Sequence, residues 1–134
     1  MQIYANDMLI YKELCYQIYG LCYGIHNKMG SVYSERQYQD AFEAKLKSAQ
    51  LAYEREKDLK FDLGEIQIGG NRVDFVVQDK IAVDLKTKKY ITREDFKQML
   101  RYLKSGKYKL GLIINFNTPK VKIQRIVNSD IVNF

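Results

Sequence analysis

Residues 72–86 read RVDFVVQDKIAVDLK, and this stretch decides the fold. Its halves, 72–77 and 81–86, alternate as β-strands do, and the three residues between them suit a hairpin loop. In that register Asp74 faces Asp84, and Arg72 faces Lys86. One face of the hairpin is then wholly apolar and consists of Val73, Phe75, Val77, Ile81, Val83 and Leu85. A shift of one residue would mix the faces, so the pattern itself selects the register.

Two helices are predicted before this hairpin. The first follows a cap at Asn6-Asp7 and ends before Gly30, and the second covers residues 34–50. Apolar residues recur at helical spacing in both, which indicates buried faces. The expected stripes are Leu14, Ile18, Leu21 and Ile25 in the first helix, and Glu35, Tyr38, Phe42 and Leu46 in the second.

The other segments are predicted as strands and one further helix. Residues 52–58 suit a strand exposed on both sides, and 61–68 a second extended piece that ends in a hairpin turn at Gly69-Gly70-Asn71. Residues 92–105 form a helix, and 110–116 and 121–127 form strands. The order α-α-β-β-β-β-α-β-β, without repeat or linker, predicts one α/β domain over residues 1–134 with a mixed sheet flanked by helices.

Composition favours a globular protein of the cytoplasm. The 134 residues are 46% apolar and 28% charged, and they include no apolar run long enough for a membrane span and no signal peptide. Cys15 and Cys22 lie roughly two helical turns, or about 11 Å, apart, too far for a disulfide. There is no second cysteine pair for zinc or an iron–sulfur cluster, and the lone His26 has no partner for a nucleophilic triad, so none of these is expected.

Positive charge is concentrated in one half of the chain. The net charge is +6, yet residues 86–125 hold twelve Lys and Arg but only Glu94 and Asp95 as acids. Such a basic patch indicates a polyanion partner, most often nucleic acid. A lysine-rich soluble surface is the alternative.

The hairpin carries the chemistry. Two opposed aspartates, Asp74 and Asp84, repel each other, and a bound divalent cation would remove that cost. Mg²⁺ or Mn²⁺ takes carboxylate and carbonyl oxygens, which adds Leu85 to the expected ligands. Lys86 points to the same face and could orient water or neutralise charge on a phosphate. A plain surface ion pair is the alternative for Asp84 and Lys86.

Two helical features support this interpretation without deciding it. Glu35 heads an apolar stripe, either as a first-turn acid favoured by the helix dipole or as a member of the metal shell. Helix 92–105 has Thr92 as its N-cap, Gly106 as its terminator, and Phe96, Leu100 and Leu103 as expected core residues. It also bears a basic ridge, which suits a phosphate backbone or is merely solvated, made of Arg93, Lys97, Arg101 and Lys104. Gln98 and Tyr102 lie beside this ridge, where they could bond or stack on a nucleic-acid strand.

These motifs together resemble those of the GxxExxY proteins. The run from Gly30 to Glu43, with Glu35 and Tyr38, matches that signature, although Val32 stands where the family has glycine. Asp74, the triplet 84–86, Gln98 with Tyr102, and the strand 110–116 follow in the family's order. The resemblance covers nearly the whole chain.

The resemblance implies a restriction-endonuclease-like fold of the PD-(D/E)xK kind. By likeness to RecB-type and lambda-exonuclease-type nucleases, Asp74 and Asp84 would bind the metal, with Glu35 nearby, and Lys86 would be the catalytic lysine. Gln98 and Tyr102 would match the helical Gln-x-x-x-Tyr element, and Tyr38 joins the ridge and Tyr102 among the expected nucleic-acid contacts. The cysteine cluster of some relatives is absent, so no iron–sulfur cluster is implied.

The expected function is metal-dependent hydrolysis of nucleic-acid phosphodiesters, of DNA in preference to RNA. The catalytic set is Glu35, Asp74, Asp84, Lys86 and Gln98. A catalytically silent nucleic-acid-binding module, or a protein-interaction module that uses the basic helix, is the alternative on the same fold. A homodimer is a candidate assembly, and no membrane partner is expected.

Overall fold

Three helices are present in the computed structural model, which describes residues 10–131. They are α2 (Lys12–Met29), α3 (Glu35–Ser48) and α4 (Arg93–Gly106). Capping boxes start α3 at Ser34, with Gln37, and α4 at Thr92, with Asp95, so both helices begin where the sequence predicts. The predicted cap at Asn6-Asp7 lies outside the described residues.

Five strands form one mixed sheet in the order β1-β4-β5-β6-β7. They are β1 (Tyr53–Asp58), β4 (Arg72–Val77), β5 (Ile81–Lys86), β6 (Leu110–Asn115) and β7 (Lys122–Val127). Only β5 and β6 are parallel, and α4 is the crossover between them. The predicted α/β class with a mixed sheet flanked by helices is therefore confirmed.

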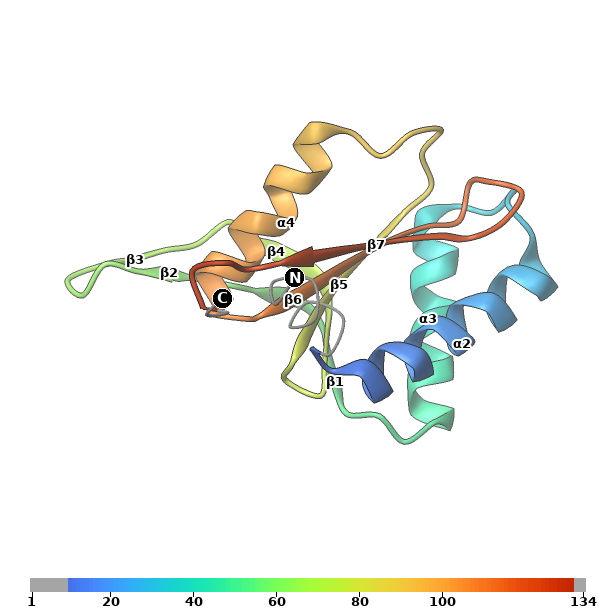
Figure 1. Cartoon of the computed structure of the whole chain (residues 1–134), viewed down its shortest axis with the longest axis horizontal. Helices are drawn as coiled ribbons and strands as arrows, with labels where there is room; N and C mark the ends of the chain where they lie inside the picture. Colours follow the sequence, from blue (N-terminus) through green and yellow to red (C-terminus); the bar gives the residue numbers. More distant parts are fainter. Residues whose placement is uncertain (1–9, 132–134) are drawn as a thin grey trace, which may run out of the picture.

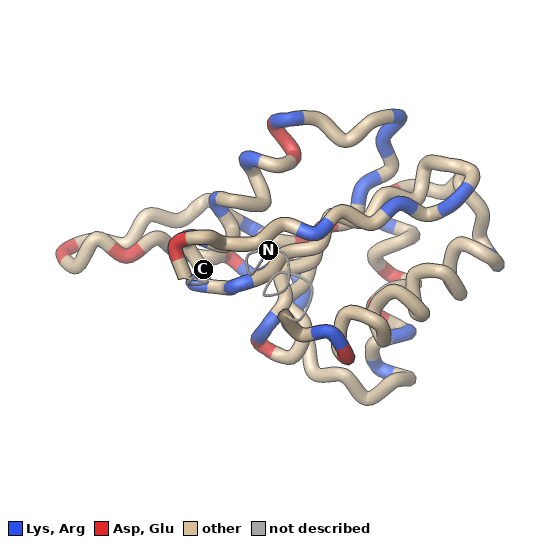
Figure 2. The backbone as a smooth tube through the Cα atoms, in the orientation of Figure 1, with Lys and Arg blue, Asp and Glu red and all other residues tan. Residues whose placement is uncertain are grey.

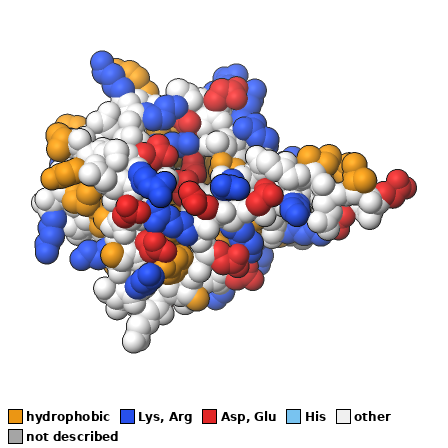
Figure 3. All heavy atoms as spheres, turned by 180° about the vertical axis from the view of Figure 1, so that it is seen from behind, with side chains coloured by type: hydrophobic (Ala, Val, Ile, Leu, Met, Phe, Trp, Pro, Cys, Tyr) orange, Lys and Arg blue, Asp and Glu red, His pale blue; other side chains and the backbone are white. Residues whose placement is uncertain are grey.

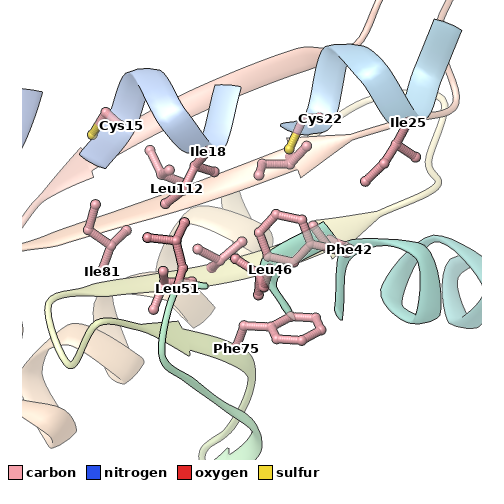
Figure 4. Close-up of a cluster of buried hydrophobic side chains, with 14 of the residues drawn as sticks. Cys15, Ile18, Cys22, Ile25, Phe42, Leu46, Leu51, Phe75, Ile81 and Leu112 are labelled. Atoms are coloured by element: carbon pink, nitrogen blue, oxygen red, sulfur yellow. The ribbon is translucent and has the colours of Figure 1, made fainter. Parts of the chain in front are cut away.

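Helices cover both faces of this sheet (Figure 1). On one face, α2 and α3 bury an apolar cluster with alternate residues of the strands, among them Phe75 and Ile81 (Figure 4). On the other face, α4 packs Met99, Tyr102 and Leu103 over Ala82 and Ile113. Successive residues of β5 thus enter two different environments.

The central hairpin has the predicted register, with Phe75 paired to Val83 and Val77 to Ile81. One residue differs from the prediction, because Val73 packs in the α4 cluster rather than with the other five apolar residues of its face. The strand is distorted between them. Neither Asp74 nor the opposing Glu56 of β1 takes part in the β1–β4 ladder, and Glu56 has a φ of 54°. The interruption lies at a proposed site residue.

A projecting arm replaces the predicted single strand at 61–68. It consists of β2 (Phe61–Asp62) and β3 (Gln67–Ile68), which pair with each other and turn at Gly64 (Figure 1). Gly69-Gly70-Asn71 is therefore not the predicted hairpin turn. It closes the neck of the arm, where the Gly70 N–H donates to Asp58 and the Leu59 N–H to the Asn71 carbonyl. Local turn chemistry could not reveal that β1, and not β3, pairs with β4.

Two further expectations about burial are wrong, and a third is right in part. In α2, Ile18 and Ile25 are buried as predicted, but Leu14 and Leu21 are only partly buried against the core, and Cys15 and Cys22 complete the buried face. In α4, Met99 and Tyr102 are buried and Leu100 is exposed. One face of β1 is half-buried because Arg55 and Tyr53 bond to Glu43 of α3. The two helix errors are rotations of the helix about its own axis, which the helical period alone does not fix.

No helix within residues 10–131 combines the length and the apolar character that crossing a bilayer requires.

Candidate active site

The α4 side of β5 carries two charged residues that are largely shielded from solvent. The Asp84 side chain is 6% exposed and that of Lys86 14%, and the Lys86 Nζ lies 2.8 Å from Asp84 Oδ2. They alternate with Val83 and Leu85, which face the opposite cluster. Burial of both partners argues against the surface ion pair considered as the alternative, because buried charges are retained only with specific partners.

Asp74 lies against this pair from the neighbouring strand. Its Oδ2 accepts the Leu85 N–H at 2.8 Å, and its carboxyl group hydrogen-bonds to that of Asp84. Burial, followed by the negative charge of Asp84, raises the pKa of Asp74 to about 8, although the Leu85 N–H acts in the opposite direction. Asp74 therefore keeps its proton at neutral pH, which relieves the repulsion predicted between the two carboxyl groups.

The Leu85 backbone borders the same space. The N–H and C=O of one strand residue point to the same side, so the Leu85 carbonyl also faces the β4 side where its N–H meets Asp74. Sequence placed Leu85 among the metal ligands through this carbonyl, and the backbone direction is compatible with that role.

Gln98 of α4 meets Lys86 directly. The Lys86 Nζ donates to Gln98 Oε1 at 2.9 Å. Burial alone would lower the pKa of Lys86, but the charge and hydrogen bond of Asp84, together with the charges of Asp95 and Glu35, raise it overall. Lys86 is therefore an ammonium ion at neutral pH, suited to stabilise negative charge and not to remove protons.

Asp95 is a site residue that sequence reasoning missed. It is 7% exposed, and its carboxylate bonds to Lys88 at 2.7 Å, lies 3.9 Å from Lys86 and caps α4 through Thr92. Burial acts to raise its pKa, yet the bonds from Lys88 and Thr92 lower it overall. The Thr-x-x-Asp pattern signalled the cap, but its contact with the lysines depends on how α4 crosses the sheet.

Glu35 reaches the site only through its charge. It is the first residue of α3, half-buried, and burial raises its pKa, with Lys86 opposing and Asp84 adding to that shift. Within residues 10–131, no three His, Cys, Asp or Glu side chains have spacing suited to one metal ion. Glu35 is thus near the aspartate pair and not in direct ligand contact alongside it.

Two tyrosines expected to contact nucleic acid are buried instead. Tyr38 is fully buried, stacks on Phe116 at 4.4 Å, and donates its hydroxyl to the Gly30 carbonyl. Tyr102 is 5% exposed, and burial followed by the charges of Asp84 and Asp74 raises the pKa of its hydroxyl. Base stacking does not fit either residue, because neither ring face is open.

The basic ridge of α4 is exposed as expected. All four of its residues, Arg93, Lys97, Arg101 and Lys104, face solvent. Two of them have acidic neighbours, since Lys97 lies 3.9 Å from Glu94 and Lys104 3.3 Å from Asp130. Figure 2 shows that Lys and Arg also gather on the loop between β5 and α4, whereas acidic and basic side chains alternate on the face in Figure 3.

The chemistry of the donor set fits a hard divalent cation. Two carboxyl groups, Asp74 and Asp84, meet at one point beside a backbone carbonyl, and one of them retains a proton that a cation would displace. Mg²⁺ typically uses one or two protein carboxylates, with water and substrate phosphate completing its shell.

A mixed sheet flanked by helices, with two aspartates and a lysine side by side on its inner strands, is the arrangement of a nuclease-like α/β fold. The family model of the PD-(D/E)XK nuclease superfamily matches residues 12–126, and the chain belongs to this superfamily. Its membership supports a nuclease-like function in general terms, and these nucleases typically use divalent metals such as Mg²⁺.

A solved structure supports the fold alone. The crystal structure of SSO0001 has 17% sequence identity and a TM-score of 0.55, and the match covers 69% of this chain and 48% of that one. The chain thus corresponds to about half of that protein's length. No curated protein matches the chain.

Proposed function

We propose that residues 1–134 form one nuclease-like domain that hydrolyses nucleic-acid phosphodiesters, DNA in preference to RNA, with Mg²⁺ or Mn²⁺. The contact between the Asp74 and Asp84 carboxyl groups beside the Lys86 ammonium carries the proposal. Aspartates are rarely buried against each other unless a proton or a cation lies between them.

Charge around the site supports a cation. Four carboxyl groups, those of Glu35, Asp74, Asp84 and Asp95, interact there with the two ammonium groups of Lys86 and Lys88. If all were ionised, the cluster would have an excess of two negative charges, which is the charge that one divalent ion neutralises. We assign Asp74, Asp84 and the Leu85 carbonyl to hold it, with Glu35 acting at longer range.

The protein's own groups would then position the phosphodiester. Lys86, held by Asp84 and Gln98, directs an ammonium charge at the position where a phosphate would approach the aspartates. Asp95 fixes the lysines from the α4 side, so the ammonium is oriented before substrate binds. When bound, the metal supplies Lewis-acid activation and an acidified water.

A cleavage panel tests the proposal. Wild-type protein is incubated with single- and double-stranded DNA and RNA, with Mg²⁺, Mn²⁺ or a chelator. We expect cleavage only with metal, and a loss of about 10²–10³-fold in Lys86→Ala and Asp84→Asn, the size typical of removing one charge-stabilising group. Lys47→Ala is the matched control, because Lys47 is exposed near the far end of α3.

Two results would reject this function. Equal cleavage by wild type and both site variants would mean that another site, or a contaminant, cuts the substrate. Salt-dependent binding without cleavage in any metal would instead favour the nucleic-acid-binding module.

A more specific family assignment also belongs to the proposal. We assign the chain to the GxxExxY proteins within the superfamily, on Glu35, Tyr38 and the pair Gln98 and Tyr102. The hydrogen bond from Tyr38 to Gly30 gives that motif a structural reason, since it joins the end of α2 to α3. Homodimer formation and a cytoplasmic location remain predictions.

A further inference from the structure

A small cavity lies near the proposed active site. Its volume is about 220 Å³, which is small compared with the roughly 300–1,000 Å³ of pockets for drug-sized ligands. Its lining consists of Lys89, Tyr90, Ile91, Ile113, Asn115, Lys122 and Gln124. The lining contains two lysines, one exposed aromatic ring and two amides, and no acid.

The strand register connects this cavity to the active site. Asp84 pairs with Ile113, which pairs with Gln124, and Lys86 pairs with Asn115, which pairs with Lys122. Side chains opposite each other on neighbouring strands point to the same face. The cavity floor thus covers the next two strands, β6 and β7, roughly 5 to 10 Å from the strand of the proposed catalytic residues. At a rise of roughly 3.4 Å per stacked nucleotide, this range corresponds to about one to three nucleotides.

The rim of the cavity is held in place by a buried amide. Asn115 is 1% exposed, its Oδ1 accepts the Lys88 N–H at 3.1 Å, and its Nδ2 donates to the Lys88 carbonyl at 2.8 Å. The Phe116 N–H also donates to the Lys86 carbonyl at 2.9 Å. The loop that carries Lys89 and Tyr90 is therefore fixed to β6, so the cavity is formed before any ligand binds.

Tyr90 is the feature that the fold does not explain. Its side chain is 70% exposed, and the Lys89 Nζ lies 5.8 Å from its ring centroid. An open aromatic ring with a cation beside it is the combination that binds a base and its phosphate in single-stranded nucleic acid. Gln124 is exposed, and its amide makes no side-chain hydrogen bond within the described part of the chain, so it can reach a base edge.

We propose that this cavity binds an unpaired nucleotide of the nucleic-acid strand, a few positions from the bond that is cleaved. The base stacks on Tyr90, and Lys89 and Lys122 bind the neighbouring phosphates. Bases inside a duplex have both faces covered by their neighbours, so the cavity favours single strands or frayed ends. This inference rests on the proposed nucleic-acid function and adds a substrate class to it.

Binding measured without divalent metal tests the cavity apart from catalysis. The probes are a fluorescent single-stranded oligothymidylate, the same length of oligouridylate, and a blunt DNA duplex, each followed by anisotropy. We expect Tyr90→Ala to bind the single strands about five- to hundred-fold more weakly, and Tyr90→Phe to bind as wild type does, since stacking needs only the ring. Lys122→Ala should reduce the salt slope by about 0.7, the share of one phosphate.

Tyr16 provides a matched control. It is 59% exposed on α2, and the Lys12 Nζ lies 5.9 Å from its ring centroid, so it repeats the Lys89–Tyr90 arrangement outside the cavity. Tyr16→Ala should leave binding unchanged. An equal loss in Tyr16→Ala and Tyr90→Ala, or unaltered binding by Tyr90→Ala, would overturn the cavity assignment. An equal loss for duplex and single strands would overturn the preference for unpaired nucleotides.

Failures of the two proposals are distinguishable. If Tyr90→Ala loses single-strand binding while wild type never cleaves, the cavity is upheld and the nuclease function is rejected. If Lys86→Ala loses cleavage while Tyr90→Ala binds normally, the nuclease function is upheld and the cavity is rejected.

Discussion

The two faces of β5 have contrasting surroundings, one apolar and the other charged. Val83 and Leu85 are fully buried beneath α2 and α3 among apolar side chains, whereas Asp84 is buried and Lys86 partly buried beneath α4 among charged groups. Burial of the apolar face stabilises the fold. Burial of the charged face costs desolvation free energy, and the proposed chemistry explains why it is kept. Alternation along one strand therefore separates stability from the proposed function, and each can be changed independently.

The largest expected effect is on the apolar face. Phe42 of α3 is fully buried and meets Phe75 edge-on, with ring centroids 5.0 Å apart. Phe42→Ala should lower the free energy of unfolding by about 3–5 kcal/mol, measured by urea denaturation. Leu100→Ala on exposed α4 surface is the control, with a change of about 0.5 kcal/mol. A change below about 1 kcal/mol for Phe42→Ala would contradict the assigned core.

The second-largest expected effect is the stabilisation of the folded protein by a metal ion bound at the charged face. Mn²⁺ at a hundred times its dissociation constant should stabilise the folded protein by about 2.7 kcal/mol, seen as a rise in the thermal midpoint. Asp84→Asn should lose this rise, whereas Asp130→Asn, at an exposed ion pair, should keep it. Retention of the full shift by Asp84→Asn would place the metal elsewhere.

The smallest expected effect is the pH dependence without metal. The pKa of Asp74 is about 8 in the folded chain and about 4 in the unfolded chain, so between these values only the folded state retains the proton. Its contribution to stability is present below about pH 4 and is lost as the pH rises through about 8. From about pH 6 to about pH 7 the free energy of unfolding should fall by up to about 1.4 kcal/mol.

Asp74→Asn should flatten this slope, because the amide does not titrate. Urea unfolding at several pH values in the presence of chelator measures this dependence of the unfolding free energy on pH. A slope that is the same in wild type and Asp74→Asn would show that the proton is held elsewhere.

Local patterns in the sequence predict much of the fold. The caps at Ser34 and Thr92 act within one turn, so the starts of α3 and α4 could be predicted. The hairpin register could also be predicted, because a slip of one residue would misplace the five apolar residues that face α2 and α3. The β2–β3 arm could not, since the choice between β3 and β1 as partner of β4 depends on contacts distant in sequence.

The candidate site likewise has a part that local sequence patterns predict and a part that they do not. Asp74, Asp84 and Lys86 come together because they share one hairpin, and Gln98 joins them as expected. Asp95 was missed and Tyr102 was expected beside the exposed ridge, because their positions depend on how α4 rotates against the sheet. Tyr38 is buried in the predicted stripe of α3, which does not fit the nucleic-acid contact that was also expected of it. Periodicity predicts that a helix has a buried side, but the residues at its margins are decided by the neighbouring element.

The arm formed by β2 and β3 has a consequence for how the protein behaves in concentrated solution. Phe61, Leu63, Ile66 and Ile68 are each at least 40% exposed on it, and both of its short strands have a free edge. Short edge strands and nearby charges limit pairing between molecules, and Asp62 and Glu65 supply those charges here. Added salt weakens that repulsion, so the arm is where strand-to-strand aggregation of this chain would begin.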